Sequence, residues 1–286
     1  MSSSLQQIGQ IGRLTFLEAV RQRFFNFLVL LALALIGGAG FFRQFDFGPQ
    51  ELAFTANFGL GSMVFFGAIL AVVVTAQLFF SEIENRTALT LLAKPVRRWS
   101  FIAGKLLGVA LLMLVFVALL TALLGGYLWW RQGQLIAIRH QLFLAGRATT
   151  EFPDYLRVHF DGLAVNALLQ WLKFVVLAAI TMVVASFSNT NMYTVAVSFF
   201  IYLICQLQYI ARDAWANVES PVLQNLIWLL GVVFPNFQLY SVGEMLVFTT
   251  KTPVPAGAVL AAIGYSVVYI LVFYALAVFS FLSREI

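Results

Sequence analysis

Three polar side chains interrupt a long apolar stretch in the second half of the chain. Asn166, Gln170 and Lys173 are spaced i, i+4 and i+7, which places them on one face of a helix. A charge in hydrocarbon needs a partner or an aqueous cavity, so such groups commonly mark the path of a substrate or an ion. We therefore treat this face as a candidate binding surface.

A second polar stripe lies in the next apolar run. It comprises Thr194, Ser198, Tyr202, Cys205 and Tyr209, with Gln206 beside it. Two interpretations remain open for the pair of faces. They line a translocation path or a dimer seam, or they hydrogen-bond to each other within one subunit, a contact worth roughly 0.6 kcal/mol per bond.

The charged residues of the first half gather in one polar island, Ser81–Ser100, between two apolar runs. The residues that we expect to carry its chemistry are Glu82, Glu84, Arg86, Thr87, Leu91, Lys94, Pro95, Arg97 and Arg98. Acids near its start and bases near its end suit a helix dipole, and Pro95 stops the helix. The island is either a docking helix on the membrane surface or an ordinary loop anchored by positive charge.

Several kinds of chemistry are not expected of this chain. Its one Gly-Lys pair, Gly104-Lys105, is followed by Leu106, and Trp99 stands where a P-loop needs its first glycine, so we expect no nucleotide site. His140 and His159 have no ligand-type neighbours at metal-binding spacing, and no nucleophile–base pair occurs in the apolar runs. No basic helix with interleaved aromatics predicts nucleic-acid binding.

The elements that position these residues follow from composition. The 286 residues are 62% hydrophobic and 10% charged, against about 25% charged in soluble domains, so we expect an integral membrane protein. A span needs about 20 apolar residues, and runs of that length form helices. The six expected spans are residues 24–42, 58–80, 101–130, 163–187, 192–210 and 256–282.

Three further segments complete the single transmembrane domain, 1–286. Residues 1–23 show apolar residues at helical spacing and predict an interfacial helix. Residues 131–162 form an outer loop. Residues 222–248 contain two short apolar pieces broken at Pro235-Asn236, which predict a re-entrant helical hairpin or, alternatively, one kinked span.

The basic residues set the expected orientation. They divide nearly evenly between the two sides, but those on the side of Ser81–Ser100 lie in short segments next to span ends. Those are the positions that the positive-inside rule weighs most. We therefore expect both termini and the island in the cytosol, with the chain integral to the cytoplasmic (inner) membrane.

The run from Glu82 to Lys105 resembles the signature of ABC type-2 exporter permeases. That signature has an acidic pair, a Thr-Leu-rich helix, a Pro followed by a small apolar and a basic residue, and a Gly-Lys that opens the next span. The matching residues here are Glu82, Glu84, Thr87, Leu89, Leu91, Leu92, Pro95, Val96, Arg97, Gly104 and Lys105. Arg86 departs from the family's usual Gly.

The resemblance implies an all-α membrane protein with six transmembrane helices, an N-terminal interfacial helix, a cytosolic coupling helix at 81–100 and an external re-entrant hairpin. It implies that Glu82, Glu84, Arg97 and Arg98 contact a cytosolic ABC ATPase, which binds ATP and Mg, while this chain holds no cofactor and is not an enzyme. A second permease copy and membrane lipids are the other expected partners. The alternatives are a non-conducting platform for a periplasmic accessory protein, which is a maturation or motility factor, and a secondary transporter.

Overall fold

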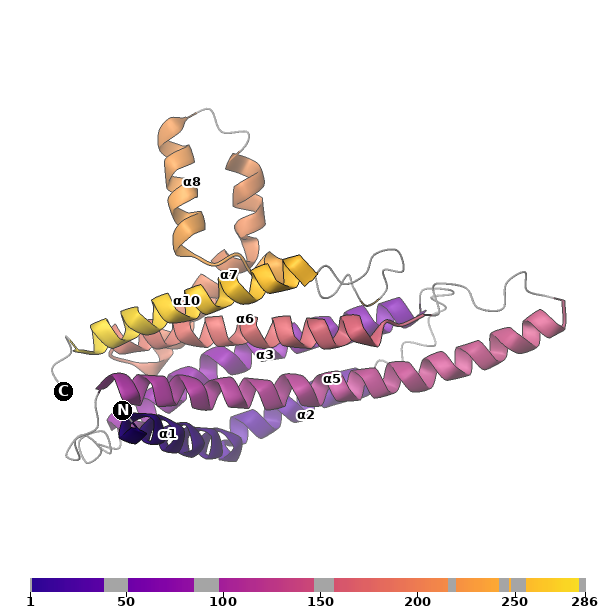
Figure 1. The fold of residues 1–286 in the computed structure, drawn as a ribbon, viewed down its shortest axis with the longest axis horizontal. Helices are drawn as coiled ribbons and strands as arrows, with labels where there is room; N and C mark the ends of the chain where they lie inside the picture. Colours follow the sequence, from indigo (N-terminus) through magenta and orange to yellow (C-terminus); the bar gives the residue numbers. More distant parts are fainter. Residues whose placement is uncertain are drawn as a thin grey trace.

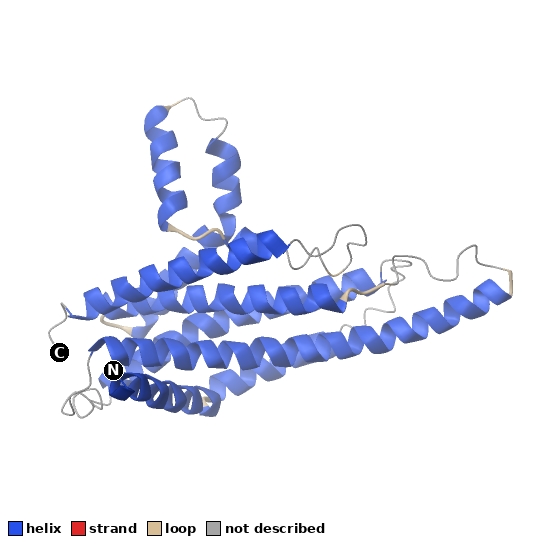
Figure 2. Ribbon diagram, in the orientation of Figure 1, coloured by secondary structure: helices blue, strands red, loops and turns tan. Residues whose placement is uncertain are grey.

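The computed structural model describes residues 2–38, 51–84, 98–146, 157–215, 220–241, 247 and 256–282. Within these ranges every regular element is a helix (Figure 2). The elements are α1 (Ser2–Arg21), α2 (Arg23–Gly38), α3 (Glu51–Glu84), α5 (Arg98–Leu144), α6 (Phe160–Phe187), α7 (Asn191–Trp215), α8 (Pro221–Val233), the 3-10 helix η4 (Phe237–Tyr240) and α10 (Ala256–Leu282).

Five of the described helices are long and apolar enough to cross a membrane: α3, α5, α6, α7 and α10. A sixth span results if α1 and α2 are counted together, although the chain bends by 64° between them. The expected first span, 24–42, corresponds to α2 as far as Gly38, and its last residues lie outside the described part. The helical membrane class is thus confirmed, with five to six candidate spans.

The longest helix, α5, differs from its expected bounds. Residues 131–144, which we expected in an outer loop, continue the helix to Leu144 because they contain no proline and only one glycine, Gly133. Its 47 residues give a length of about 70 Å, more than twice the roughly 30 Å of hydrocarbon. Figure 1 shows α5 running past the ends of α6 and α10.

The centre of the bundle is α6, which contacts α3, α5, α7 and α10. Every residue from Leu172 to Met182 is buried, so this helix is enclosed on all sides. An apolar sequence without a polar face, such as that of α6 after Lys173, is what a fully surrounded helix requires.

The start of α5 packs closely against α1. A Cβ atom at Gly108 would lie 2.6 Å from the Cβ of Thr15 and 2.8 Å from the carbonyl oxygen of Gly12, and one at Gly104 would lie 2.6 Å from the Cβ of Ile11. The glycines of Gly104-x-x-x-Gly108 thus permit close packing of the two helices. The partner is α1, which lies along this part of α5 rather than apart from the bundle.

The segment before the last span is described only in part. The first expected piece is the helix α8, and residues 237–240 after the break form the short 3-10 helix η4. Most of the second expected piece, residues 239–248, lies outside the described residues. The end of α7 packs beside α8, and the two stand away from the bundle as a pair (Figure 1). The pairing arises because Pro235 and Asn236 end the helical run and turn the chain back towards α6.

Candidate functional site

Lys173 lies in the middle of α6, fourteen residues from Phe187, at the depth where a charge is most unfavourable in a membrane. The Lys173 side chain is 3% exposed, and Asn166 and Gln170 on the same face are 0% and 1% exposed. The polar face of α6 is therefore buried in protein and does not face lipid. On insertion scales, a lysine at the centre of a span costs about 2.5–3.5 kcal/mol.

The side chain of Lys173 points at η4. Its Nζ atom lies 5.6 Å from the centre of the Phe237 ring, at cation–π distance. The ring of Tyr202, on α7, lies 6.0 Å from the same Phe237 ring, and the ring of Tyr240 lies 6.0 Å from it on η4. The two polar stripes that the sequence marked, on α6 and α7, thus converge on a residue that the sequence analysis did not single out.

We call this group the helix-break site, comprising Lys173, Tyr202, Cys205, Phe237, Tyr240 and Ser266. The Tyr240 hydroxyl and the Ser266 hydroxyl on α10 are 2.8 Å apart and share a hydrogen bond. The Cys205 thiol, about one helical turn after Tyr202 on α7, is fully buried. Elements α6, α7, η4 and α10 therefore all contribute to one buried site.

The irregular backbone between α8 and η4 is held by side chains of α7 and α10. Gln208 on α7 donates from Nε2 to the carbonyl oxygens of Gly231 (3.1 Å) and Phe234 (2.8 Å). Tyr269 on α10 donates to the carbonyl oxygen of Val232 at 2.9 Å. These three carbonyls end α8 and would otherwise lack a helical partner, so the side chains cap the helix.

The backbone N–H groups after the break are satisfied in the same way. The Asn236 N–H donates to the Tyr265 hydroxyl at 2.7 Å, and the Asn236 side chain accepts from the Gln238 N–H at 2.9 Å. Backbone groups outside a helix need partners from side chains or water. Here, four side chains, from Gln208, Asn236, Tyr265 and Tyr269, supply them.

The remaining residues of the predicted translocation path do not all lie close together. The three-residue connection between α6 and α7 makes these helices antiparallel neighbours. Asn166 lies 21 residues before the end of α6, about 31 Å along the axis, whereas Thr194 lies in the first turn of α7. Thr194 bonds back to the Thr190 carbonyl, and Ser198 is fully buried, so both lie towards the other end of the helix pair from Asn166.

Three of these side chains have buried polar atoms without a hydrogen bond among the described residues. Both amide atoms of Asn166 and the hydroxyl of Ser198 have no partner among the described residues, and the buried Oε1 atom of Gln206 has none either. Buried polar atoms are nearly always paired in native structures, so each exception requires a physical reason. These atoms are available to an incoming water molecule or substrate.

Three of the predicted coupling residues belong to the described part and lie at the end of the bundle where α3 ends and α5 begins, which we call the proximal end. Glu82 and Glu84 form the last turn of α3. Arg98 is the first residue of α5, and its guanidinium donates to the carbonyl oxygens of Phe281 (3.5 Å) and Leu282 (3.2 Å), the last residues of α10. The other candidates, Arg86, Thr87, Leu91, Lys94, Pro95 and Arg97, lie outside the described residues.

Arg98 therefore caps a helix C-terminus, where a positive charge stabilises the unpaired carbonyls and the dipole. The family resemblance predicted that Arg98 contacts an ATPase. Its bond to the end of α10 was not predicted, because the partner carbonyls lie 183 residues later in the chain. Phe101 also stacks on Phe281, and the Tyr274 hydroxyl donates to the Trp99 carbonyl. The start of α5 is thus bound to the end of α10 by several contacts.

Two further contacts join α3 and α1 to this end. Lys105, fully buried on α5, donates from Nζ to the carbonyl oxygen of Leu78 on α3. Ser81 on α3 donates to the Glu18 carboxylate on α1 at 3.2 Å. Helices α1, α3, α5 and α10 are therefore connected immediately beside the segment that joins α3 to α5.

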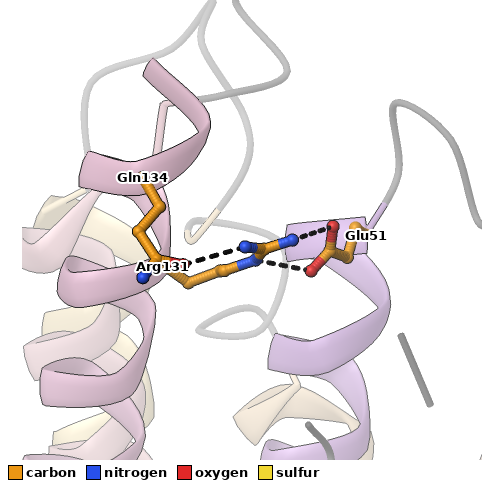
Figure 3. Close-up of polar contacts among 3 residues, drawn as sticks. All are labelled: Glu51, Arg131 and Gln134. Atoms are coloured by element: carbon orange, nitrogen blue, oxygen red, sulfur yellow. Dashed lines mark hydrogen bonds and ion pairs between the residues drawn. The ribbon is translucent and has the colours of Figure 1, made fainter. Parts of the chain in front are cut away.

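The opposite, distal end carries an ion pair that joins α3 to α5 (Figure 3). Arg131 donates from Nε and Nη2 to the two carboxylate oxygens of Glu51 at 2.7 and 2.9 Å, and from Nη1 to Gln134 at 2.9 Å. Such a bidentate pair fixes the relative position of the two helices. Arg131 was expected to start a loop but instead anchors a continuing helix.

We expect Glu51→Gln to lower the stability of the protein by about 1 kcal/mol, since both side chains are only about a fifth exposed and the pair is bidentate. Thermal unfolding of the purified protein measures the effect. The charge swap Glu51→Arg with Arg131→Glu is the control and should recover part of the loss. A Glu51→Gln protein as stable as the wild type, at low and at high salt, would show that the pair has no structural role.

The described helices include five or six that are long and apolar enough to cross a membrane, with a lysine buried among them, so the chain is an integral membrane protein. Residues 10–286 match the model of a protein family described as "ABC-2 family transporter protein". The chain therefore belongs to the ABC-2 family of transporter proteins. A search of curated proteins found no match. The resemblance noted from Glu82 to Lys105 is thus confirmed at the level of the family.

Proposed function

We propose that this chain is the transmembrane permease subunit of an ATP-binding-cassette exporter in the cytoplasmic (inner) membrane. A separate cytosolic ATPase binds ATP and Mg and contacts the coupling segment 81–100, and both termini of the chain lie in the cytosol. A second permease copy completes the transport unit. The proposal is supported by the family match and by the start of α1 and the end of α10, which lie at the same end of the bundle (Figure 1).

The observation that carries the mechanism is the bond from Arg98 to the end of α10. A movement of the segment between α3 and α5 displaces Arg98, and Arg98 displaces the carbonyls of Phe281 and Leu282. Because α10 is one uninterrupted helix of 27 residues, the displacement reaches Tyr269 and Tyr265, which hold the helix break. The ATPase thereby acts on the helix-break site through α10.

The translocation path in this proposal runs between α6 and α7. Its residues are Asn166, Gln170, Lys173, Thr194, Ser198, Tyr202 and Gln206. The side chains of Lys173 and Tyr202 both lie next to the Phe237 ring. Further along α6 and α7, Asn166 and Ser198 have polar atoms without a partner among the described residues. Opening at the helix break would expose these groups to water and to substrate.

A test of the ATPase contact uses the acidic pair at the end of α3. We expect the double change Glu82→Lys and Glu84→Lys to reduce the amount of ATPase that co-purifies with the chain by about tenfold, because it replaces complementary charge by repulsion at an interface. The reversal Glu151→Lys, on the other side of the membrane in the proposed topology, is the matched control. A complex indifferent both to these reversals and to deletion of residues 85–94 would refute the contact.

A second candidate function is a non-conducting platform for a periplasmic maturation or motility factor. The observation that favours it is the far part of α5, which reaches beyond a membrane thickness and exposes Ile138 (51%) and Leu144 (71%). Exposed apolar side chains on a helix outside the bilayer are typical of a protein-binding surface. Co-purification of such a factor, lost on Ile138→Asp, without any ATP-dependent change in the permease would favour this function over transport.

A further inference from the structure

We propose that the helix-break site binds an amphipathic anion, with the anionic group held by Lys173 and the apolar part against the rings of Phe237 and Tyr202. This inference rests on the proposed function, because it names the class of substrate that the path would carry. Neither the family description nor the motif at residues 82–105 specifies a substrate of this kind.

The position of the Lys173 ammonium group and its contact with an aromatic ring favour binding of an anion. Lys173 is 3% exposed, lies at the centre of α6, and directs Nζ at a ring face 5.6 Å away. A full negative charge attracts an ammonium group more strongly than the quadrupole of a phenyl ring does, above all where water is excluded. An anion that reaches this site therefore competes successfully with the ring for Lys173.

The second argument is that the frame of the site is built from other residues. The hydrogen bonds that hold the break come from Gln208, Tyr265 and Tyr269, and the Tyr240–Ser266 bond joins η4 to α10. A charged residue at this depth is rarely retained for packing alone. The frame keeps its own bonds while Lys173 exchanges the ring for a ligand.

The third argument is the chemical character of the surroundings. Phe237, Tyr240 and Cys205 are buried, and Tyr202 is partly buried, so the surface next to the cation is aromatic and apolar. Two helical turns away on the same face, Asn166 is 0% exposed and neither of its amide atoms has a partner among the described residues. A matching ligand has a charged group at Lys173, an apolar body along the aromatic side chains and a further polar group at Asn166.

Cys205 provides the experiment, since it is the one cysteine of the chain and lies about one helical turn after Tyr202 on α7. Membranes that contain the chain with its ATPase are treated with three methanethiosulfonates: a sulfonate, a trimethylammonium and a neutral methyl reagent. Modification of Cys205 is followed by mass spectrometry. After normalisation to the neutral reagent, we expect the sulfonate to react about tenfold faster than the trimethylammonium reagent.

Substitutions of Lys173 test whether this residue causes the preference for the sulfonate reagent. We expect Lys173→Met to bring the sulfonate-to-trimethylammonium ratio close to one and Lys173→Arg to preserve it. The change Arg13→Gln, which removes an exposed positive charge on α1, is the control and should leave the ratio unchanged. A wild-type ratio near one, a preference for the cationic reagent, or a ratio that Lys173→Met does not alter would each overturn the proposal.

Protection experiments then separate the possible sources of the anion. Decyl phosphate should slow modification of Cys205 by the neutral reagent in the wild type and not in Lys173→Met, whereas decanol should not slow it in either. Inorganic phosphate as effective as decyl phosphate would overturn the amphipathic part of the proposal. Stronger protection in vesicles that contain phosphatidylglycerol than in those of phosphatidylcholine alone would identify a lipid headgroup, and equal protection would identify a dissolved amphiphile.

The two proposals can fail separately. A charge preference with modification rates that are the same with and without ATP and the ATPase supports the anion site and counts against the ATP-driven mechanism. ATP-dependent modification of Cys205 without any charge preference supports the ATP-driven mechanism and counts against the anion site.

Discussion

Replacing Gly108 with alanine is expected to destabilise the protein by about 3 kcal/mol, near the upper end of the usual cost of overpacking. The added methyl group would lie 2.6 Å from the Cβ of Thr15 and 2.8 Å from the Gly12 carbonyl oxygen. Neither atom lies at the end of a flexible side chain, so α1 must move away from α5. Thermal unfolding in detergent measures the loss.

The matched control is Gly126→Ala on the same helix, where no atom lies within 4 Å of the added methyl group. That change should be neutral or stabilising by about 0.5–1 kcal/mol, because alanine favours the helix. Trypsin cleavage after the exposed Arg13 should also become faster in the Gly108 variant, since α1 is released. Equal stability of the two variants would mean that α1 does not pack on α5.

The second large effect is expected from Gln208→Leu. This change keeps the approximate side-chain size but removes the donor that bonds the carbonyl oxygens of Gly231 and Phe234. The bond to Phe234 is partly buried, and a buried carbonyl left unpaired costs about 1–3 kcal/mol. Denaturant or thermal unfolding in detergent measures the loss of stability, and displacement of η4 should also move Phe237 away from Lys173.

Gln206→Leu is the control, because it makes the same substitution two residues earlier on the same helix. The buried Oε1 atom of Gln206 has no partner among the described residues, so its removal should not lower the stability. If Gln208→Leu is no more destabilising than Gln206→Leu, the break is not held by α7.

The spans could largely be predicted from the sequence, because length and apolar composition determine them locally. The predicted span 163–187 agrees with α6, and 256–282 coincides with α10. The far part of α5 could not be predicted in this way, because residues 131–144 become polar at the membrane boundary while their helix propensity continues. Polarity marks the end of a span, not the end of a helix.

The packing of α1 was predicted only in part. The sequence showed apolar residues at helical spacing, yet Leu5, Leu14 and Leu17 are exposed, and the buried face comprises the small residues Gly12, Thr15 and Ala19. Hydrophobicity indicates which face avoids water, whereas close contact between helices in a membrane favours small residues. That α1 lies in the membrane interface stays a prediction.

Only part of the helix-break site was predicted from the sequence. Lys173 and Tyr202 were marked because polar groups in apolar runs are conspicuous, but Phe237 and Tyr240 are aromatic residues in a chain with 29 Phe and 9 Tyr. Their role depends on contacts with α6 and α10, which are distant in sequence. The local signal was Pro235-Asn236, which located the break but not the helices that would surround it.

The central claim is that a separate ATPase opens this buried site, and the modification rate of Cys205 tests it most directly. The wild-type chain is reconstituted in liposomes with its ATPase, and Cys205 is reacted with a neutral methanethiosulfonate with and without ATP and Mg. We predict slow modification without ATP, because Cys205 is 0% exposed, and a rate about tenfold higher or more with it, the change that a population shift of about 1.4 kcal/mol produces. A rate that is the same with and without the ATPase and ATP would contradict the account.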